Sequence, residues 1–174
     1  MVSVSAMTVH PEYSGIRGAA INDLAVLTLA EPVTGVDPIE LPGAGFLDRS
    51  AARNGLTNHT FTNVGYGAVP SQTGPWWTWT VLDDGIRRVS TSPFQGLTQH
   101  WLNLNMNTNA TGEGGVCIND SGSPKFFEAA GGENGNLAVA ITTAIDPRCR
   151  TTNSNERLDT ASARDFLGEF VTLP

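Results

Sequence analysis

The sequence has only two cysteines and no long hydrophobic run, and these absences limit what the chain can do. Cys117 and Cys149 cannot form a structural zinc site by themselves, and no C-x-x-C redox motif is present. No run of about 18 apolar residues occurs, so no segment reads as a membrane span. The first residues, MVSVSAMTVHPEY, lack the basic and apolar regions of a signal peptide.

Positive charge is also scarce. The chain of 174 residues has 10 Lys and Arg against 17 Asp and Glu, a formal net charge of −7. Affinity for nucleic acid rests on clustered Lys and Arg, so we expect no nucleic-acid partner. The length suffices for one ample hydrophobic core, or for two small cores packed together.

Short runs rich in β-branched or aromatic residues dominate the sequence, and clusters of Gly, Pro, Asn and Asp separate them. Such runs predict strands. We expect strands near the N-terminus, where Val2, Val4 and Ala6 alternate with serines, and at residues 24–29, 60–67, 77–82, 86–91, 101–106 and 137–143. Many short strands of this kind favour a barrel or a sandwich.

Two other segments differ from this pattern. After Asp159, an expected N-cap, apolar residues recur at helical spacing and predict a C-terminal helix: Ala163, Phe166, Leu167, Phe170 and Val171. The Pro- and Gly-rich residues 31–47 lack regular periodicity, and we expect them to connect two packing units. The tryptophans of residues 76–79 fit core or loop packing, with stacking on a sugar as the alternative.

The segment GGVCINDSGSPKFF, residues 114–127, raises the question of a nucleophile. Taken alone, Asp120, Ser121 and Gly122 indicate no more than a turn. Cysteine usage favours a disulfide between Cys117 and Cys149 in an oxidising compartment.

Several segments together are more specific. CINDSGSP resembles the nucleophile segment Cys-x-Gly-Asp-Ser-Gly-Gly-Pro of trypsin-like (chymotrypsin-fold) serine proteases, and INDLAVLTL resembles their aspartate segment. FTNVGYG and VAITTAIDPRC resemble two further family segments in the same order, and RLDTASARDFLGEF is similar to the terminal helix of bacterial secreted members. The resemblance implies an all-β, chymotrypsin-like double β-barrel with a C-terminal α-helix.

The resemblance also implies roles for particular residues. Asp23 and Ser121 would be catalytic, and the backbone N–H groups of Asn119 and Ser121 would form the oxyanion hole. Asp120 and Gly122 would support the site, and the Cys117–Cys149 disulfide would lie beside the substrate pocket. That pocket would be lined by Gly115, Val116, Thr143, Ala144 and Ile145, with a preference for small or medium apolar side chains. No metal or organic cofactor is implied.

The sequence departs from the family at three places. Asn119 stands where the family has a glycine that can need positive φ, and Ser123 replaces a second glycine. No segment resembles the family's Ala-Ala-His-Cys, which carries the catalytic base. We expect His10, His59 and His100 to be solvated or strand-end residues, with His10 in a surface segment.

These departures predict an N-terminally shortened protease. Residues 1–45 would be the closing part of an incomplete first barrel with the inter-barrel connection, and residues 46–174 the second barrel with its helix. We expect a secreted serine endopeptidase acting on a protein or peptide substrate, inactive in this form, with a missing N-terminal segment as its partner. The alternative is a non-catalytic binding module on the same fold. Asp23, Asp120 and Ser121 favour the first hypothesis, whereas Asn119 and the missing histidine favour the second.

Overall fold

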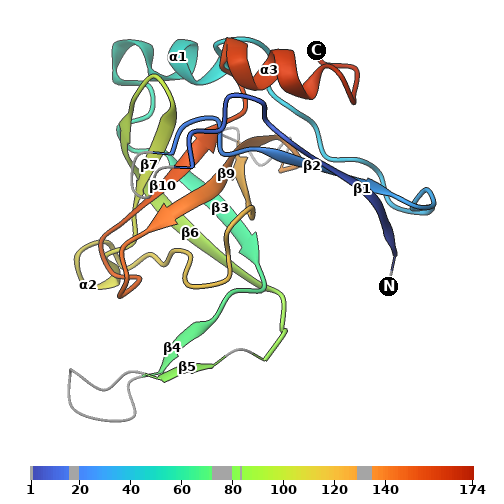
Figure 1. Cartoon of the computed structure of the whole chain (residues 1–174). Coiled ribbons are helices and arrows are strands. Elements are labelled where there is room, and N and C mark those ends of the chain that lie inside the picture. The colour runs from blue at the N-terminus through green and yellow to red at the C-terminus, as the bar shows by residue number, and fades with distance from the viewer. Residues whose placement is uncertain (1, 16–19, 72–79, 83, 129–134) are drawn as a thin grey trace.

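Six antiparallel strands form a closed barrel in the computed structural model, which describes residues 2–15, 20–71, 80–82, 84–128 and 135–174. The barrel order is β10-β7-β6-β3-β8-β9, and β9 closes it by pairing with both β8 and β10 (Figure 1). Its strands are β3 (Thr60–Gly65), β6 (Arg88–Leu97), β7 (Trp101–Asn105), β8 (Pro124–Phe127), β9 (Ala138–Ile145) and β10 (Thr152–Arg157).

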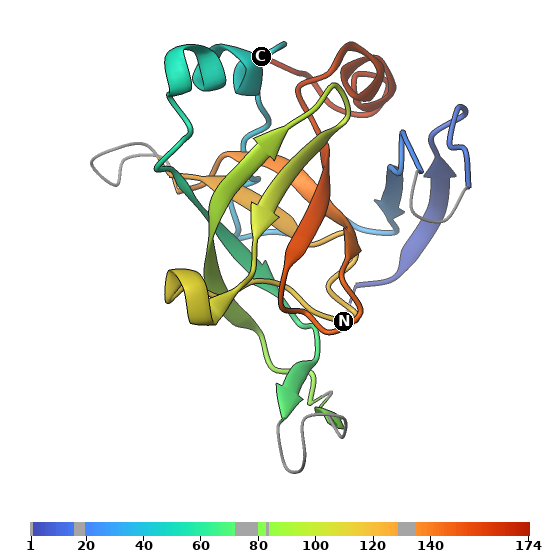
Figure 2. The same ribbon diagram turned by 90° about the vertical axis from the view of Figure 1, so that its left-hand side faces the viewer.

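A separate hairpin precedes the barrel. Strands β1 (Val4–Val9) and β2 (Ala25–Leu29) pair only with each other, and Figure 2 shows them beside the barrel rather than within it. A second short pair consists of β4 (Val69–Ser71) and β5 (Thr80–Leu82). It extends from the end of the barrel opposite to α1 and α3 (Figure 1). Of the strand predicted at residues 77–82, residues 80–82 form β5, whereas residues 77–79 and the tryptophans of residues 76–79 lie outside the described residues.

The barrel core follows from strand alternation. Along β7, Leu102 and Leu104 are fully buried while their neighbours are half-buried, the period of two expected for one inward face. Helix α1 (Phe46–Ala51) covers one end of the barrel and contributes Leu47. The buried cluster consists of Leu47, Leu56, Phe61, Leu102, Leu104, Val139 and Ala140.

A second cluster joins the hairpin to the barrel. Leu24 at the base of β2 packs with Leu158, Ala163 and Phe166, which belong to the end of β10 and to helix α3 (Ala161–Leu167). The short helices η1 (Ala52–Asn54) and α2 (Thr108–Thr111) complete the described elements. The hairpin is thus fixed at its base, directly beside Asp23.

The C-terminal helix is confirmed, but its predicted N-cap is wrong. Thr160 caps α3 by accepting a hydrogen bond from the N–H of Ala163 at 3.2 Å. Asp159 is instead buried, where it binds the Arg157 guanidinium and accepts from the N–H of Leu47. The helix also ends earlier than its apolar periodicity indicates, because Phe170 and Val171 lie beyond it and are 37% and 47% exposed.

The connection and the strand list need two further corrections. Residues 31–47 are largely irregular, as expected, but α1 begins at Phe46 within them. Strands β8 and β10 were not predicted, since their sequences are PKFF and TNSNER. The division of the chain at residues 45 and 46 stays a prediction.

Candidate functional site

Asp23 lies in a tight turn just before β2. Asn22 has a φ of 57° and is 5% exposed, and the N–H of Leu24 donates to its carbonyl at 2.8 Å. Asparagine tolerates this left-handed conformation better than most residues. The Asn22 side chain accepts from the Ser162 hydroxyl at 2.8 Å, which fastens the turn to α3.

Ser121 lies exposed in the turn that leads into β8. The N–H of Ser123 donates to the carbonyl of Asp120 at 2.9 Å, and the N–H of Gly122 donates to the carbonyl of Thr142 at 2.8 Å. Gly122 has a φ of 81°, a conformation that favours glycine. The backbone on both sides of Ser121 is therefore fixed, and its side chain faces solvent.

The Asp120 carboxylate holds this turn from the inside. It is 8% exposed and accepts from the N–H of Gly67 at 2.7 Å and from that of Cys117 at 2.9 Å. A Cβ on Gly65 or Gly67 would come within 2.0 or 2.2 Å of this carboxylate. Both positions are glycine because the carboxylate lies against their backbone.

Two sequence predictions about this loop can be compared directly with the structure. The Cys117–Cys149 disulfide is confirmed. Asn119 has a φ of 74°, so asparagine adopts the conformation that the family glycine would take. The oxyanion hole at Asn119 and Ser121 stays a prediction.

Strand β9 brings Asp23 and Ser121 to the same place. The Thr143 hydroxyl donates to Asp23 Oδ2 at 3.0 Å, which links the hairpin to the barrel. Thr143 also lines a pocket of about 390 Å³ together with Ser121. Asp23 is therefore bonded to a residue that lines the same pocket as Ser121, which lies 98 positions later in the chain.

The predicted substrate-pocket residues divide between two cavities. Thr143, Ala144 and Ile145 line the pocket beside Ser121. Gly115 and Val116 instead line a pocket of about 270 Å³ that contains Asp120. Cys117 borders both cavities. A Cβ on Gly115 would meet the Met106 side chain at 2.5 Å, so Met106 forms the floor at that point.

His10 follows β1, but its predicted surface position is wrong. The residue is 5% exposed, and its ring lies 4.9 Å from that of Phe166. Nδ1 accepts from the N–H of Glu12 at 3.1 Å, which leaves the proton on Nε2, 3.3 Å from the carbonyl oxygen of Ser162. Both ring nitrogens are therefore engaged in the hairpin base.

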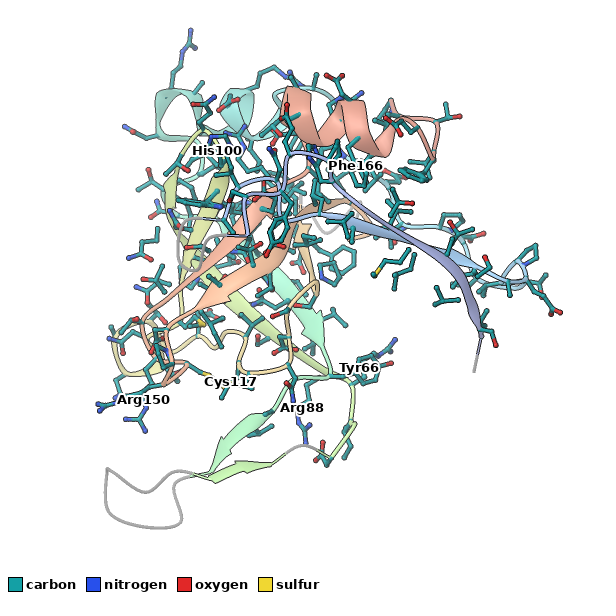
Figure 3. All side chains as sticks on the ribbon, in the orientation of Figure 1. Tyr66, Arg88, His100, Cys117, Arg150 and Phe166 are labelled. Atoms are coloured by element: carbon teal, nitrogen blue, oxygen red, sulfur yellow. A yellow bond between two sulfur atoms is a disulfide. The ribbon has the colours of Figure 1, made fainter. Side chains whose placement is uncertain are left out.

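The other two histidines lie at barrel strand ends, as predicted. His59 precedes β3 and stacks on Phe127 with ring centroids 4.2 Å apart, and burial lowers its pKa. His100 lies in the turn between β6 and β7, and Figure 3 shows it at the opposite end of the barrel from Cys117. None of the three histidines lines the pocket beside Ser121.

Sequence reasoning missed two buried ionisable residues near the site. Glu156 is 1% exposed and accepts from the N–H of Asn22 at 3.2 Å. Burial raises the pKa of Glu156 to about 7. Lys125 is fully buried with Nζ 3.4 Å from Ser123 Oγ, and burial lowers its pKa to about 7 against the opposing charge of Asp120.

Comparisons with known proteins bear on the fold. No protein-family profile and no curated protein matches the sequence. The structure is similar to that of a double mutant of human heparin binding protein (CAP37), with a TM-score of 0.62 and 20% sequence identity. The match covers 97% of this chain and 64% of that one, so this chain spans about two thirds of the matched protein.

This likeness shows the fold. The chain has a chymotrypsin-like, mostly β architecture in which one barrel is closed, the other is represented by the β1–β2 hairpin, and a helix follows the last strand. The predicted fold class is thereby confirmed. Among the described residues, no helix is long and apolar enough to cross a bilayer, and no cluster of His, Cys, Asp and Glu could hold a metal.

Proposed function

We propose that this chain carries the nucleophile and the orienting aspartate of a serine endopeptidase. The observation that carries the proposal is the position of Thr143, which binds the Asp23 carboxylate and lines the same pocket as Ser121. A nucleophile and the group that orients its base must lie within a few side chains of each other. β9 provides that proximity.

The reaction would form and then hydrolyse an acyl-enzyme. Ser121 Oγ would attack the scissile carbonyl carbon while a histidine takes its proton, and Asp23 would stabilise the resulting imidazolium. The amine would leave with that proton, and water would release the acid and regenerate the Ser121 hydroxyl. The N–H groups of Asn119 and Ser121 would bind the oxyanion, each worth roughly 3 kcal/mol of transition-state stabilisation.

The histidine would come from a segment outside this sequence. His10, His59 and His100 are engaged elsewhere in the fold. The matched structure is longer than this chain, and the hairpin leaves large apolar side chains exposed, including Met7 at 67% and Leu27 at 54%. Additional strands of the first barrel would cover these side chains and complete the site. The disulfide fits a secreted protein.

A serine-directed fluorophosphonate tests the nucleophile, because it reacts with an activated hydroxyl in an assembled oxyanion hole. We expect Ser121 to be labelled in the protein from its natural source but not in this 174-residue chain. A Ser123→Ala variant is the matched control, since the second serine should not react. Rapid labelling of the chain alone would place the base within it, and no labelling of either protein would support a binding module.

Substrate preference follows from the pocket beside Ser121. The residues described around it include Ile118, Ala144 and Ile145 and no charged side chain. We therefore propose cleavage after small or medium apolar side chains. Peptides that differ only in the residue before the cleaved bond would test this with the natural protein, and fastest cleavage after Arg would contradict it.

A non-catalytic binding module is the second candidate. It is favoured by the engagement of all three histidines and by the name of the matched structure, a heparin binding protein. The net charge of −7 opposes binding to a polyanion such as heparin. A peptide ligand fits this candidate better.

A further inference from the structure

We propose that Glu156 is a positioning residue for Asp23, acting as a buried carboxyl that holds the Asp23 turn on the barrel. The inference deepens the proposed function and rests on it for its catalytic meaning. The hydrogen bonds that support it do not depend on activity.

Glu156 reaches the turn from the barrel. It lies on β10, opposite Ile141 of β9, and its Oε1 accepts from the N–H of Asn22 at 3.2 Å. Glu156 Oε2 has no hydrogen-bond partner among the described residues. The backbone of the hairpin turn is therefore held by one barrel side chain, which lies 134 residues away from Asn22 in sequence.

The side chain of Asp23 is held separately. Its Oδ2 accepts from the Thr143 hydroxyl on β9, the strand that pairs with β10. The backbone of Asn22 and the carboxylate of Asp23 are thus held from two adjacent strands of one sheet. Glu156 restrains where the residue lies, and Thr143 restrains where its carboxylate points.

The surroundings of Glu156 make its charge matter. The N–H of Asn22 is its hydrogen-bond partner among the described residues, and the Asp23 carboxylate lies near enough to affect its pKa. Arg157 is directed to Asp159 and Asp48, and His10 to Ser162, so neither compensates the Glu156 charge. Burial, with a smaller contribution from Asp23, raises the pKa of Glu156 to about 7. Below that pH Glu156 is mostly neutral, and above it a negative charge develops on Glu156 beside Asp23.

Both protonation states can accept hydrogen bonds. A protonated carboxyl keeps a carbonyl oxygen with two lone pairs, so the N–H of Asn22 keeps an acceptor. Titration therefore changes the electrostatic environment of Asp23 more than its position. In a working protease, the extra negative charge would favour the protonated form of the base that Asp23 orients.

Amide-resolved NMR of the full chain tests the proposal. We expect the Asp23 amide shift to titrate with a midpoint near pH 7, and Glu156→Gln to abolish that titration while the Asn22 amide stays protected. Glu156→Leu should speed hydrogen exchange at Asn22 at least tenfold, with β3 and β6 amides unchanged as the folding control. Glu169→Gln, in the exposed C-terminal segment, should alter neither readout.

The proposal fails if the Asp23 shift is flat between pH 5 and 9, if its titration persists in Glu156→Gln, or if Glu156→Leu leaves exchange unchanged. Should Glu156→Leu not fold, the Glu156→Gln titration still decides. None of these measurements needs catalysis. If the protein from its natural source is not labelled by the fluorophosphonate while the NMR result is positive, the endopeptidase is rejected and the positioning of the turn is kept.

Discussion

The barrel and the β1–β2 hairpin differ in how completely their strands are paired and in how deeply their apolar side chains are buried. Each barrel strand pairs with two neighbours, whereas β1 and β2 each pair with one. The barrel buries Leu102 and Leu104 completely, whereas Met7 and Leu27 of the hairpin are more than half exposed. The difference shows that Ser121 belongs to a self-contained unit, while Asp23 belongs to a segment held mainly at its base.

The largest effect should come from breaking the buried ion pair between Arg157, at the end of β10, and Asp159. Arg157→Ala would leave the fully buried Asp159 carboxylate without its partner, and we expect the free energy of unfolding to fall by about 4 kcal/mol. Chemical denaturation would measure it. The matched control is Asp48→Asn on the other side of the same arginine, since Asp48 is 65% exposed and should contribute under about 1 kcal/mol. Equal losses would contradict this account.

Replacing the buried Lys125 of the barrel with an uncharged residue should increase the free energy of unfolding. Lys125 has a folded pKa of about 7, below its ordinary 10.5, so the unfolded chain binds more protons between these pH values. The stability of the wild-type protein should therefore rise as pH increases from 7 to 10.5. Lys125→Met should remove this dependence and stabilise the chain by roughly 4 kcal/mol at pH 7. Denaturation curves at pH 7 and 10 check it, and a destabilised variant would show that the ammonium is well compensated.

A pair of leucine truncations compares the two regions directly. Leu104→Ala should cost about 3 kcal/mol because it leaves a cavity in the closed barrel. Leu27→Ala, at a side chain 54% exposed, should cost less than about 0.5 kcal/mol. Thermal or urea unfolding of both variants measures the two losses in the free energy of unfolding, which can then be compared. A large loss at Leu27 would mean that the hairpin is stabilised along its length.

The smallest effect on stability should come from a substitution on the exposed face of the hairpin, which should nevertheless reduce the apolar surface of the protein. Met7→Ser removes the most exposed apolar side chain of β1, and we expect unfolding to change by less than about 0.5 kcal/mol. Binding of a hydrophobic dye should decrease, because the exposed apolar surface becomes smaller. Unchanged dye binding would indicate that another surface is responsible.

Sequence patterns predicted the strands whose inward residues are apolar and missed those whose inward residues are polar. β10 reads TNSNER, yet Asn153 and Asn155 are fully buried and bind each other at 2.6 Å. Hydrophobic alternation cannot reveal a strand whose buried face carries polar side chains that hydrogen-bond to one another. The same limit applies to β8, where the inward residue is Lys125.

The site was predictable only where a local motif carries it. The residues around Ser121 form one continuous segment, and its turn, its disulfide and the conformation of Asn119 can be compared with the family pattern. Glu156 acts on a turn at the other end of the chain, and nothing in NSNER indicates that contact. His10 was misplaced because its burial depends on Phe166 of α3, which lies 156 residues later.

The hairpin is attached to the barrel at one end, so the rest of it can rotate about that attachment as a rigid arm. The hydrogen bond from His10 to the Leu24 carbonyl marks the pivot, next to Asp23, and six residues of β1 extend about 20 Å from it. By that geometry, a displacement of about 2 Å at the tip corresponds to a rotation of roughly 6° at the pivot. A force applied at the far end of the hairpin would therefore act on Asp23 through this pivot, and the hydrogen bonds from Thr143 to Asp23 and from Asn22 to Glu156 would oppose it.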